Sequence, residues 1–179
     1  LVGSEMCIRD RYYKKYAKAK HAQTVLTEQI ALAERELDYL SSVQDAVFRA
    51  GSERDFAELR QELALAGLCG DVRASKSGKK GGRPAPSKPL VFTLTSGRTV
   101  RVGKNNLQND ALTFGADKTD IWFHVKGFPG SHAVLFTGGA EPTDLDYTES
   151  AMLAAYHSKA SGGVNVQVDY TPVRFVKKP

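Results

Sequence analysis

The sequence predicts an α+β protein in which an antiparallel helical hairpin is joined by a flexible basic linker to a small, mainly antiparallel domain. Three observations predict this arrangement. Residues 12–70 carry two amphipathic helical patterns, residues 71–89 are almost free of apolar side chains, and residues 90–179 contain short strand-like runs between turn residues. Strands and helices do not alternate regularly, which disfavours a doubly wound nucleotide-binding fold.

The first helical pattern is long and has the spacing of a coiled coil. Apolar residues recur in steps of three and four, and neither Pro nor Gly interrupts them between Tyr12 and Gly51. The seam contains Tyr16, Ala19, Leu26, Ile30, Ala33, Leu37, Leu40 and Val47, with Gln23 and Gln44 at the two remaining positions. Charged residues flank this seam, so we expect an exposed arm rather than a helix packed within a bundle.

A second, shorter helical pattern follows at once. Gly51 suits a helix C-cap, and Ser52 with Asp55 resembles a capping box that begins a helix ending near Gly67. A short connection between two amphipathic helices predicts an antiparallel pair. Because the second helix is much shorter, we expect part of the first seam to pair with another chain or with a coiled-coil segment that this sequence lacks. Residues 1–11 show no repeat and are predicted to be a non-native leader.

The positive charge is concentrated in residues 71–89. The net charge of the whole chain is +5, and this segment carries six basic residues and one acidic residue among Gly, Ser and Pro. It buries too little apolar surface to offset its ordering entropy, so it is predicted to be a flexible tether. It is either a solvated spacer or a tether that binds nucleic-acid phosphates through Lys79, Lys80 and Arg83.

Residues 90–179 are predicted to form a small sheet with one helix. Ser96-Gly97 and Pro129-Gly130 supply the turns of two strand pairs, and the polar residues 103–110 between the pairs predict a loop with a helical turn. Residues 143–160 predict a helix whose small side chains let it lie close to the sheet. The predicted strands are residues 90–94, 98–102, 120–125, 131–136, 164–170 and 173–176.

One predicted strand carries chemically distinctive side chains on a single face. Asp120, Trp122 and His124 share that face, and a turn centred on Phe128 brings His124 opposite His132. A metal site is disfavoured, because Asp120 and His124 are ~13 Å apart at the usual strand rise and two histidines lack a third ligand. The same spacing disfavours a hydrolase built on these residues. The remaining interpretations are a second packing layer and a surface in which Trp122 and the two histidines bind bases or sugars.

A polar run that precedes this strand in the sequence is a second candidate site. It offers cationic and amide donors that suit either turn formation or contacts to phosphate and 2′-hydroxyl groups. The run consists of Arg101, Lys104, Asn105, Asn106, Gln108 and Asn109.

Several other classes of protein have no support in the sequence. It has neither a phosphate-binding loop nor a dinucleotide fingerprint, so no cofactor is expected. Cys7 and Cys69 make neither a disulfide framework nor a metal-binding pair. No apolar run has the length of a membrane span or of a secretory signal. We therefore expect a cytoplasmic protein with no membrane partner and no metal.

Short motifs follow one another along the chain in the order that a known family shows. The first are Tyr12-Tyr-Lys-Lys-Tyr16, Glu36-Leu-Asp-Tyr-Leu40, Val102-Gly-Lys-Asn-Asn-Leu-Gln-Asn-Asp110, Leu112-Thr-Phe114 and Asp120-Ile-Trp-Phe-His124. The others are Pro129-Gly-Ser-His132, Ala154-Ala-Tyr-His-Ser-Lys159, Val168-Asp-Tyr-Thr171 and Val176-Lys-Lys-Pro179. Residues 12–68 resemble the coiled-coil middle region of the NFACT family. Residues 90–179 resemble its RNA-binding NFACT-R domain without the end of that module.

The resemblance implies a function in ribosome-associated quality control. The bacterial branch of the family, the RqcH-type or fibronectin-binding protein A-like proteins, binds the large ribosomal subunit and its rRNA when a nascent chain has stalled. These proteins recruit alanyl-tRNA, and an untemplated alanine tail is added to the nascent chain. The ribosome forms the bond, so the resemblance implies a tRNA-selecting factor without catalytic residues of its own. A fibronectin-binding surface adhesin, which the older family label suggests, is the alternative.

Overall fold

The structure is a computed structural model that describes residues 2–69 and 87–177, with side chains from Cys7 onward. It divides into two compact units, residues 1–40 and residues 41–179. Most of the predicted basic tether lies outside the described residues. Lys79, Lys80 and Arg83 also lie outside the described residues, so their predicted role stays a prediction.

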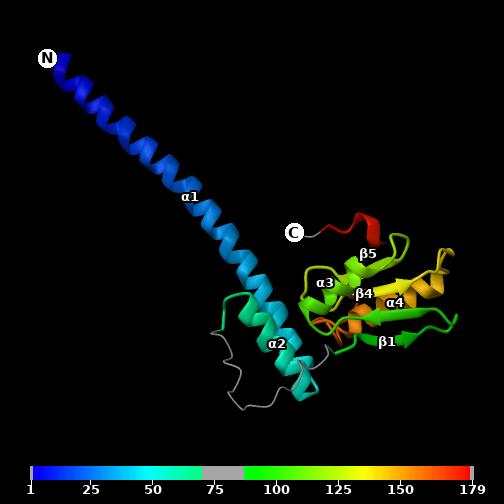
Figure 1. Ribbon diagram of the computed structural model, residues 1–179. Helices are drawn as coiled ribbons and strands as arrows, with labels where there is room; N and C mark the ends of the chain where they lie inside the picture. The colour runs from blue at the N-terminus through cyan, green and yellow to red at the C-terminus, as the bar shows by residue number, and fades with distance from the viewer. Residues whose placement is uncertain (1, 70–86, 178–179) are drawn as a thin grey trace, which may run out of the picture. The chain divides into compact units, whose positions relative to one another are not determined.

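Two helices form the N-terminal part of the fold. The first, α1, runs without interruption from Val2 to Arg49, so the predicted leader residues from Val2 onward continue the helix (Figure 1). The apolar seam residues Leu26, Ile30 and Leu37 are each more than half exposed. This exposure agrees with the expectation that the seam lacks a partner within residues 1–40.

The second helix, α2, runs from Glu53 to Leu65 and begins as the sequence predicts. The Ser52 side chain accepts a hydrogen bond from the Asp55 backbone N–H and donates one to the Asp55 carboxylate, 2.8 Å away. After the helix, Gly67 has a φ of 73°, a left-handed conformation that glycine adopts without strain. The predicted N-cap at Ser52 and the predicted end near Gly67 are therefore confirmed. Gly51, which was predicted to cap the first helix in a left-handed conformation, is not among the described glycines with positive φ, because α1 already ends at Arg49.

The C-terminal part is a five-stranded antiparallel sheet with strand order β1-β2-β4-β3-β5, which confirms the α+β prediction (Figure 1). The predicted hairpin at Ser96-Gly97 is present, and Trp122 pairs with Val134 as a turn centred on Phe128 requires. The strands are β1 (Leu90–Thr93), β2 (Thr99–Val102), β3 (Ile121–Val125), β4 (Ala133–Phe136) and β5 (Val168–Pro172).

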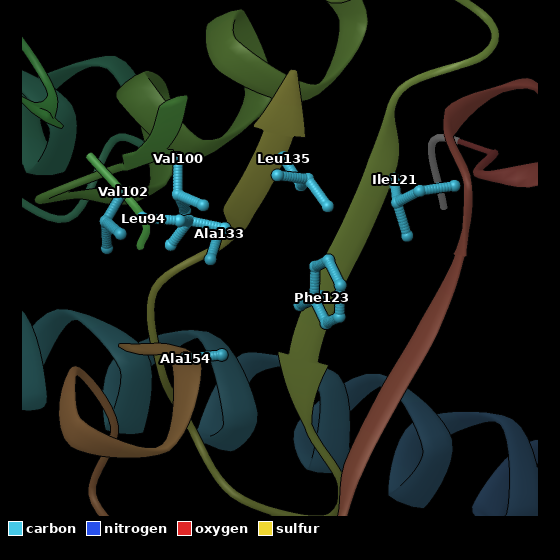
Figure 2. Packing of buried hydrophobic residues seen from close by; sticks show 8 residues of the cluster. All are labelled: Leu94, Val100, Val102, Ile121, Phe123, Ala133, Leu135 and Ala154. Atoms are coloured by element: carbon cyan, nitrogen blue, oxygen red, sulfur yellow. The ribbon is translucent and has the colours of Figure 1, made fainter. Parts of the chain in front are cut away.

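One face of the sheet forms the main core. Side chains from the central strands gather on this face with Ala154 of α4, the helix Asp144–Tyr156 (Figure 2). Phe123, Ala133, Leu135 and Ala154 are fully buried. Ser150 of the same helix is also fully buried, so the predicted small-residue stripe does let α4 approach the sheet closely.

A second, smaller cluster lies on the other face. Leu112 of α3 (Asn106–Gly115) and Val173 of the 3₁₀-helix η1 (Val173–Phe175) meet Val134 there, and Trp122 and Phe136 pack beside them. The sheet thus has packed side chains on both faces, against α4 on one and against α3 and η1 on the other.

Three predicted elements differ from the structure. Residues 103–110 were expected to form a loop with one helical turn, but α3 begins at Asn106 and extends to Gly115, because the Asn105 side chain caps it by accepting from the Gln108 N–H. Residues 164–167 are not a strand. β5 begins only at Val168, because its partner β3 ends at the opposite residue, Val125. The expected strand at 173–176 is the 3₁₀-helix η1.

Candidate nucleic-acid interface

Three aromatic side chains lie together on the face of the sheet that α3 partly covers. Trp122 and His124 come from β3, and His132 lies just before β4. The Trp122 and His124 rings are stacked with their centroids 5.6 Å apart, and His132 meets each of them edge-on, at 5.2 Å and 5.5 Å. We call these three residues the ring cluster. The structure therefore brings together Trp122, His124 and the predicted partner of His124, His132, whereas Asp120, which was predicted on the same face, is not part of the cluster.

The ring cluster also takes part in packing. Trp122 is half-buried beside the cluster of Leu112 and Val134. Its indole Nε1 is buried and has no hydrogen-bond partner among the described residues. Trp122 is therefore packed over part of its ring and exposed over the rest, an arrangement that is compatible with either interpretation drawn from the sequence.

Hydrogen bonds from α3 hold His132 in place. Its ring Nδ1 lies 2.8 Å from Oγ1 of Thr113, which is fully buried, and its backbone N–H donates to Asn109 Oδ1 at 3.1 Å. Burial, together with the nearby His124, lowers the pKa of His132 to about 4. Burial also lowers the pKa of His124. Both rings are therefore neutral at pH 7 and offer flat faces rather than positive charge.

An exposed cation, Arg101, lies two strands from Trp122 on the same face of the sheet. Arg101 on β2 pairs with Val134, which in turn pairs with Trp122, so the three residues form one row across the sheet. Side chains opposite one another in antiparallel strands share a face. The Arg101 guanidinium lies 4.6 Å from the centroid of the Phe136 ring. Arg101 and the ring cluster thus combine a cation with stacking surfaces, the composition of many single-strand RNA sites.

The rest of the predicted polar run contacts other parts of the protein. Asn105, Gln108 and Asn109 are buried. Asn109 is engaged by His132, whereas the other residues of the run point toward α2. We call this second group the donor row: Lys104, Asn105, Asn106 and Gln108.

The partners of the donor row are acidic side chains on one face of α2. Lys104 Nζ lies 3.3 Å from Asp55 Oδ1, and the amides of Asn105 and Gln108 donate to Glu58 Oε2 at 3.2 Å and 3.1 Å. Asn106 Nδ2 donates to Glu62 Oε1 at 2.8 Å. Asp55, Glu58 and Glu62, the acidic row, were not predicted as site residues. Their spacing of three and four residues on a helix was the signal that could have identified them.

Hydrogen bonds keep two members of the acidic row, Asp55 and Glu58, ionised. Burial tends to raise the pKa of Glu58, but hydrogen bonds from Ser87, Asn105 and Gln108 outweigh burial and lower it. Burial likewise tends to raise the pKa of Asp55, and hydrogen bonds from Ser52 and Lys104 outweigh it and lower that pKa as well. Two negatively charged carboxylates therefore face the donor row at neutral pH.

The carboxylate of Asp120 has a structural role. It is nearly fully buried and accepts hydrogen bonds from the Thr137 N–H at 2.8 Å and the Asp117 N–H at 3.1 Å, so it ties together the loops at that end of β3 and β4. Within the described ranges there is no group of three or more His, Cys, Asp or Glu side chains that could hold a metal ion. Among the helices of the same ranges, none is long and apolar enough to cross a membrane.

A protein family and two individual proteins with similar sequences point to the same relatives of this chain. The protein-family model described as NFACT N-terminal and middle domains matches residues 9–81 of this chain. The chain is 42% identical to the Rqc2 homolog RqcH of Bacillus subtilis (strain 168) and 41% identical to that of Streptococcus suis (strain 05ZYH33). Both alignments cover 94% of this chain, which spans only 29% and 30% of those two proteins.

A solved structure matches as well. The C-terminal part of the fibronectin/fibrinogen-binding protein from Streptococcus suis is 40% identical in sequence and superposes with a TM-score of 0.82. The match covers 95% of this chain and 67% of that one. Sequence and structure agree over nearly the whole length, and the chain belongs to the NFACT family.

Proposed function

We propose that the chain is part of a ribosome-associated quality-control factor that binds the large ribosomal subunit and tRNA in the cytoplasm. The observation that carries this proposal is the 42% identity to an RqcH protein over 94% of the chain. Untemplated alanine tailing would need the regions of such proteins that this chain does not span. The ribosome forms the peptide bond in this scheme, so the chain would contribute binding rather than catalytic residues.

Arg101 and the ring cluster are the surface that fits this function best. The neutral rings can stack on unpaired bases, and Arg101 can bind a phosphate or stack on a base. Stacking is worth about 1–3 kcal/mol per base, which corresponds to roughly 5- to 150-fold in affinity.

The test is binding of tRNA and of purified large ribosomal subunits to the chain and two variants. Trp122→Leu keeps an apolar side chain in the packed cluster but removes the stacking face, so it is expected to weaken binding at least about fivefold. Arg101→Ala is expected to weaken binding and to flatten its salt dependence, because a phosphate contact is lost.

Matched controls separate the site from general effects. Arg60→Ala removes an exposed cation from α2, and Tyr156→Ala removes an exposed aromatic ring from α4, which covers the opposite face of the sheet. Both are expected to bind like the parent. Thermal melts show that each variant is folded at the assay temperature. Parent-like binding by both site variants would refute this surface, and no binding by the parent would refute the proposed function.

A second candidate function follows from the solved neighbour, which is described as a fibronectin/fibrinogen-binding protein. Immobilised fibronectin and fibrinogen test it directly. Saturable binding to either protein, with no binding to ribosomal subunits or tRNA, would favour an adhesin.

A further inference from the structure

We propose that the acidic row of α2 occupies an anion-binding site on the donor row, and that RNA phosphates bind the same donors when α2 undocks. The closed arrangement would then be autoinhibitory. This inference rests on the proposed function, because it names the site and the control of RNA binding. The donors and acceptors involved all lie within the second compact unit, residues 41–179.

The donor row has the composition of an oxyanion site. One ammonium group and three side-chain amides converge at the start of α3, and each donates to a carboxylate of the acidic row. Phosphate oxygens accept hydrogen bonds from the same kinds of donor. The positive end of the α3 dipole, a helix of 10 residues, adds to the attraction for negative charge.

The acidic row has the properties of a competitor for that site. Its three carboxylates repeat along one face of a helix, much as phosphates repeat along a nucleic-acid backbone. Glu58, the middle residue of the acidic row, is held by Ser87 as well, because the Ser87 N–H and hydroxyl both donate to its carboxylate. RNA and α2 therefore cannot both bind the donor row.

The closed arrangement contains a group that is incompletely bonded. Glu62 is only 3% exposed, and its Oε2 is buried without a hydrogen-bond partner among the described residues. Burying charge without full hydrogen bonding is costly. Undocking would hydrate Glu62, and this hydration would offset part of the free energy lost with the contacts. The docked and undocked states would then differ less in free energy than the contacts alone suggest.

The experiment measures affinity for fluorescently labelled bulk tRNA. The double variant Glu58→Gln/Glu62→Gln keeps the side-chain volumes and weakens the closed state. Relieving a closed state that predominates is expected to raise affinity about tenfold. Removing negative charge from any protein also favours RNA, so the control is Glu53→Gln/Glu36→Gln, which neutralises two exposed carboxylates that are outside the acidic row. The control is expected to gain much less.

Two further measurements identify the mechanism. Lys104→Ala in the Glu58→Gln/Glu62→Gln background is expected to lower affinity, because this donor would contact RNA in the open state, whereas Lys159→Ala is expected to leave it unchanged. In the parent, tRNA is expected to speed hydrogen exchange of residues 53–65, because α2 leaves its site.

The outcomes separate this inference from the proposed function. If the parent binds tRNA but the double variant gains no more than its control, or if tRNA slows exchange in α2, the autoinhibitory site is wrong and the proposed function stands. If neither the parent nor the double variant binds tRNA, both are wrong. If the double variant binds tRNA while the parent binds only large ribosomal subunits, both are supported.

Discussion

Acid should destabilise the C-terminal domain through His132. Burial and the neighbouring His124 lower the pKa of His132 from 6.5 to about 4, so the folded state resists protonation. In the unfolded chain, His132 takes up a proton already near its ordinary pKa of 6.5. The contribution of the neutral His132 ring to the free energy of unfolding is therefore present above pH 6.5 and is lost as the pH falls toward 4. At pH 5 the unfolded ring is mostly charged and the folded ring is mostly neutral. The free energy of unfolding at pH 5 is then about 2 kcal/mol lower than at pH 7 through this one group.

The assay is urea denaturation of the parent and of His132→Asn at several values of pH between 5 and 7. The variant is expected to be less stable at pH 7, because its hydrogen bond with Thr113 changes. Between pH 7 and pH 5, however, it should lose about 2 kcal/mol less than the parent. His21→Asn, which alters an exposed histidine of α1, should follow the parent curve. Parallel curves for the parent and His132→Asn, or an NMR titration of His132 near its ordinary pKa, would refute the reasoning.

Three other predictions concern stability and association. Gly103→Ala should cost about 1–3 kcal/mol in urea denaturation, because the added Cβ would collide with the side-chain oxygen of Asn109 and press on its backbone N, whereas Gly115→Ala, with open space around it, should cost little. Thr143→Ala should cost about 1 kcal/mol through loss of the α4 N-cap, and Thr148→Ala, whose hydroxyl bonds only within the helix, should cost less in the same assay. The exposed seam of α1 should cause association that grows with concentration in sedimentation, and Leu37→Lys should weaken it.

Local patterns sufficed for most of the fold. The predicted turn centred on Phe128 correctly placed Trp122 opposite Val134, because a hairpin with alternating side chains has few possible registers. The predicted strand at 164–170 was only partly right, although its alternation is the most regular in the chain. A strand exists only where a neighbour supplies hydrogen bonds, and β3 ends opposite Val168. The backbone of Asn165, with a φ of 58°, turns away from extended geometry just before that point.

The candidate site was predictable in part. The sequence indicated that Trp122 and His124 would share a face and that His132 would lie opposite His124, because strand register alone determines that placement. It did not indicate that Asn105 and Gln108 would be buried against Glu58, since those partners are about fifty residues apart in sequence. A polar run looks the same in a sequence whether its donors bind water, a ligand or a distant carboxylate. Long-range packing decides between these outcomes.

The helix α3 connects the two polar surfaces of the domain. Gln108 at its start donates to Glu58 of the acidic row, and the next residue, Asn109, accepts from the backbone of His132 in the ring cluster. One turn later, Thr113 bonds to the His132 ring. A shift of α3 that releases α2 would therefore also move the partners that hold His132, whereas independent surfaces would share no such element. If the donor row and the ring cluster both bind RNA, this shared helix gives a physical reason for them to become available together.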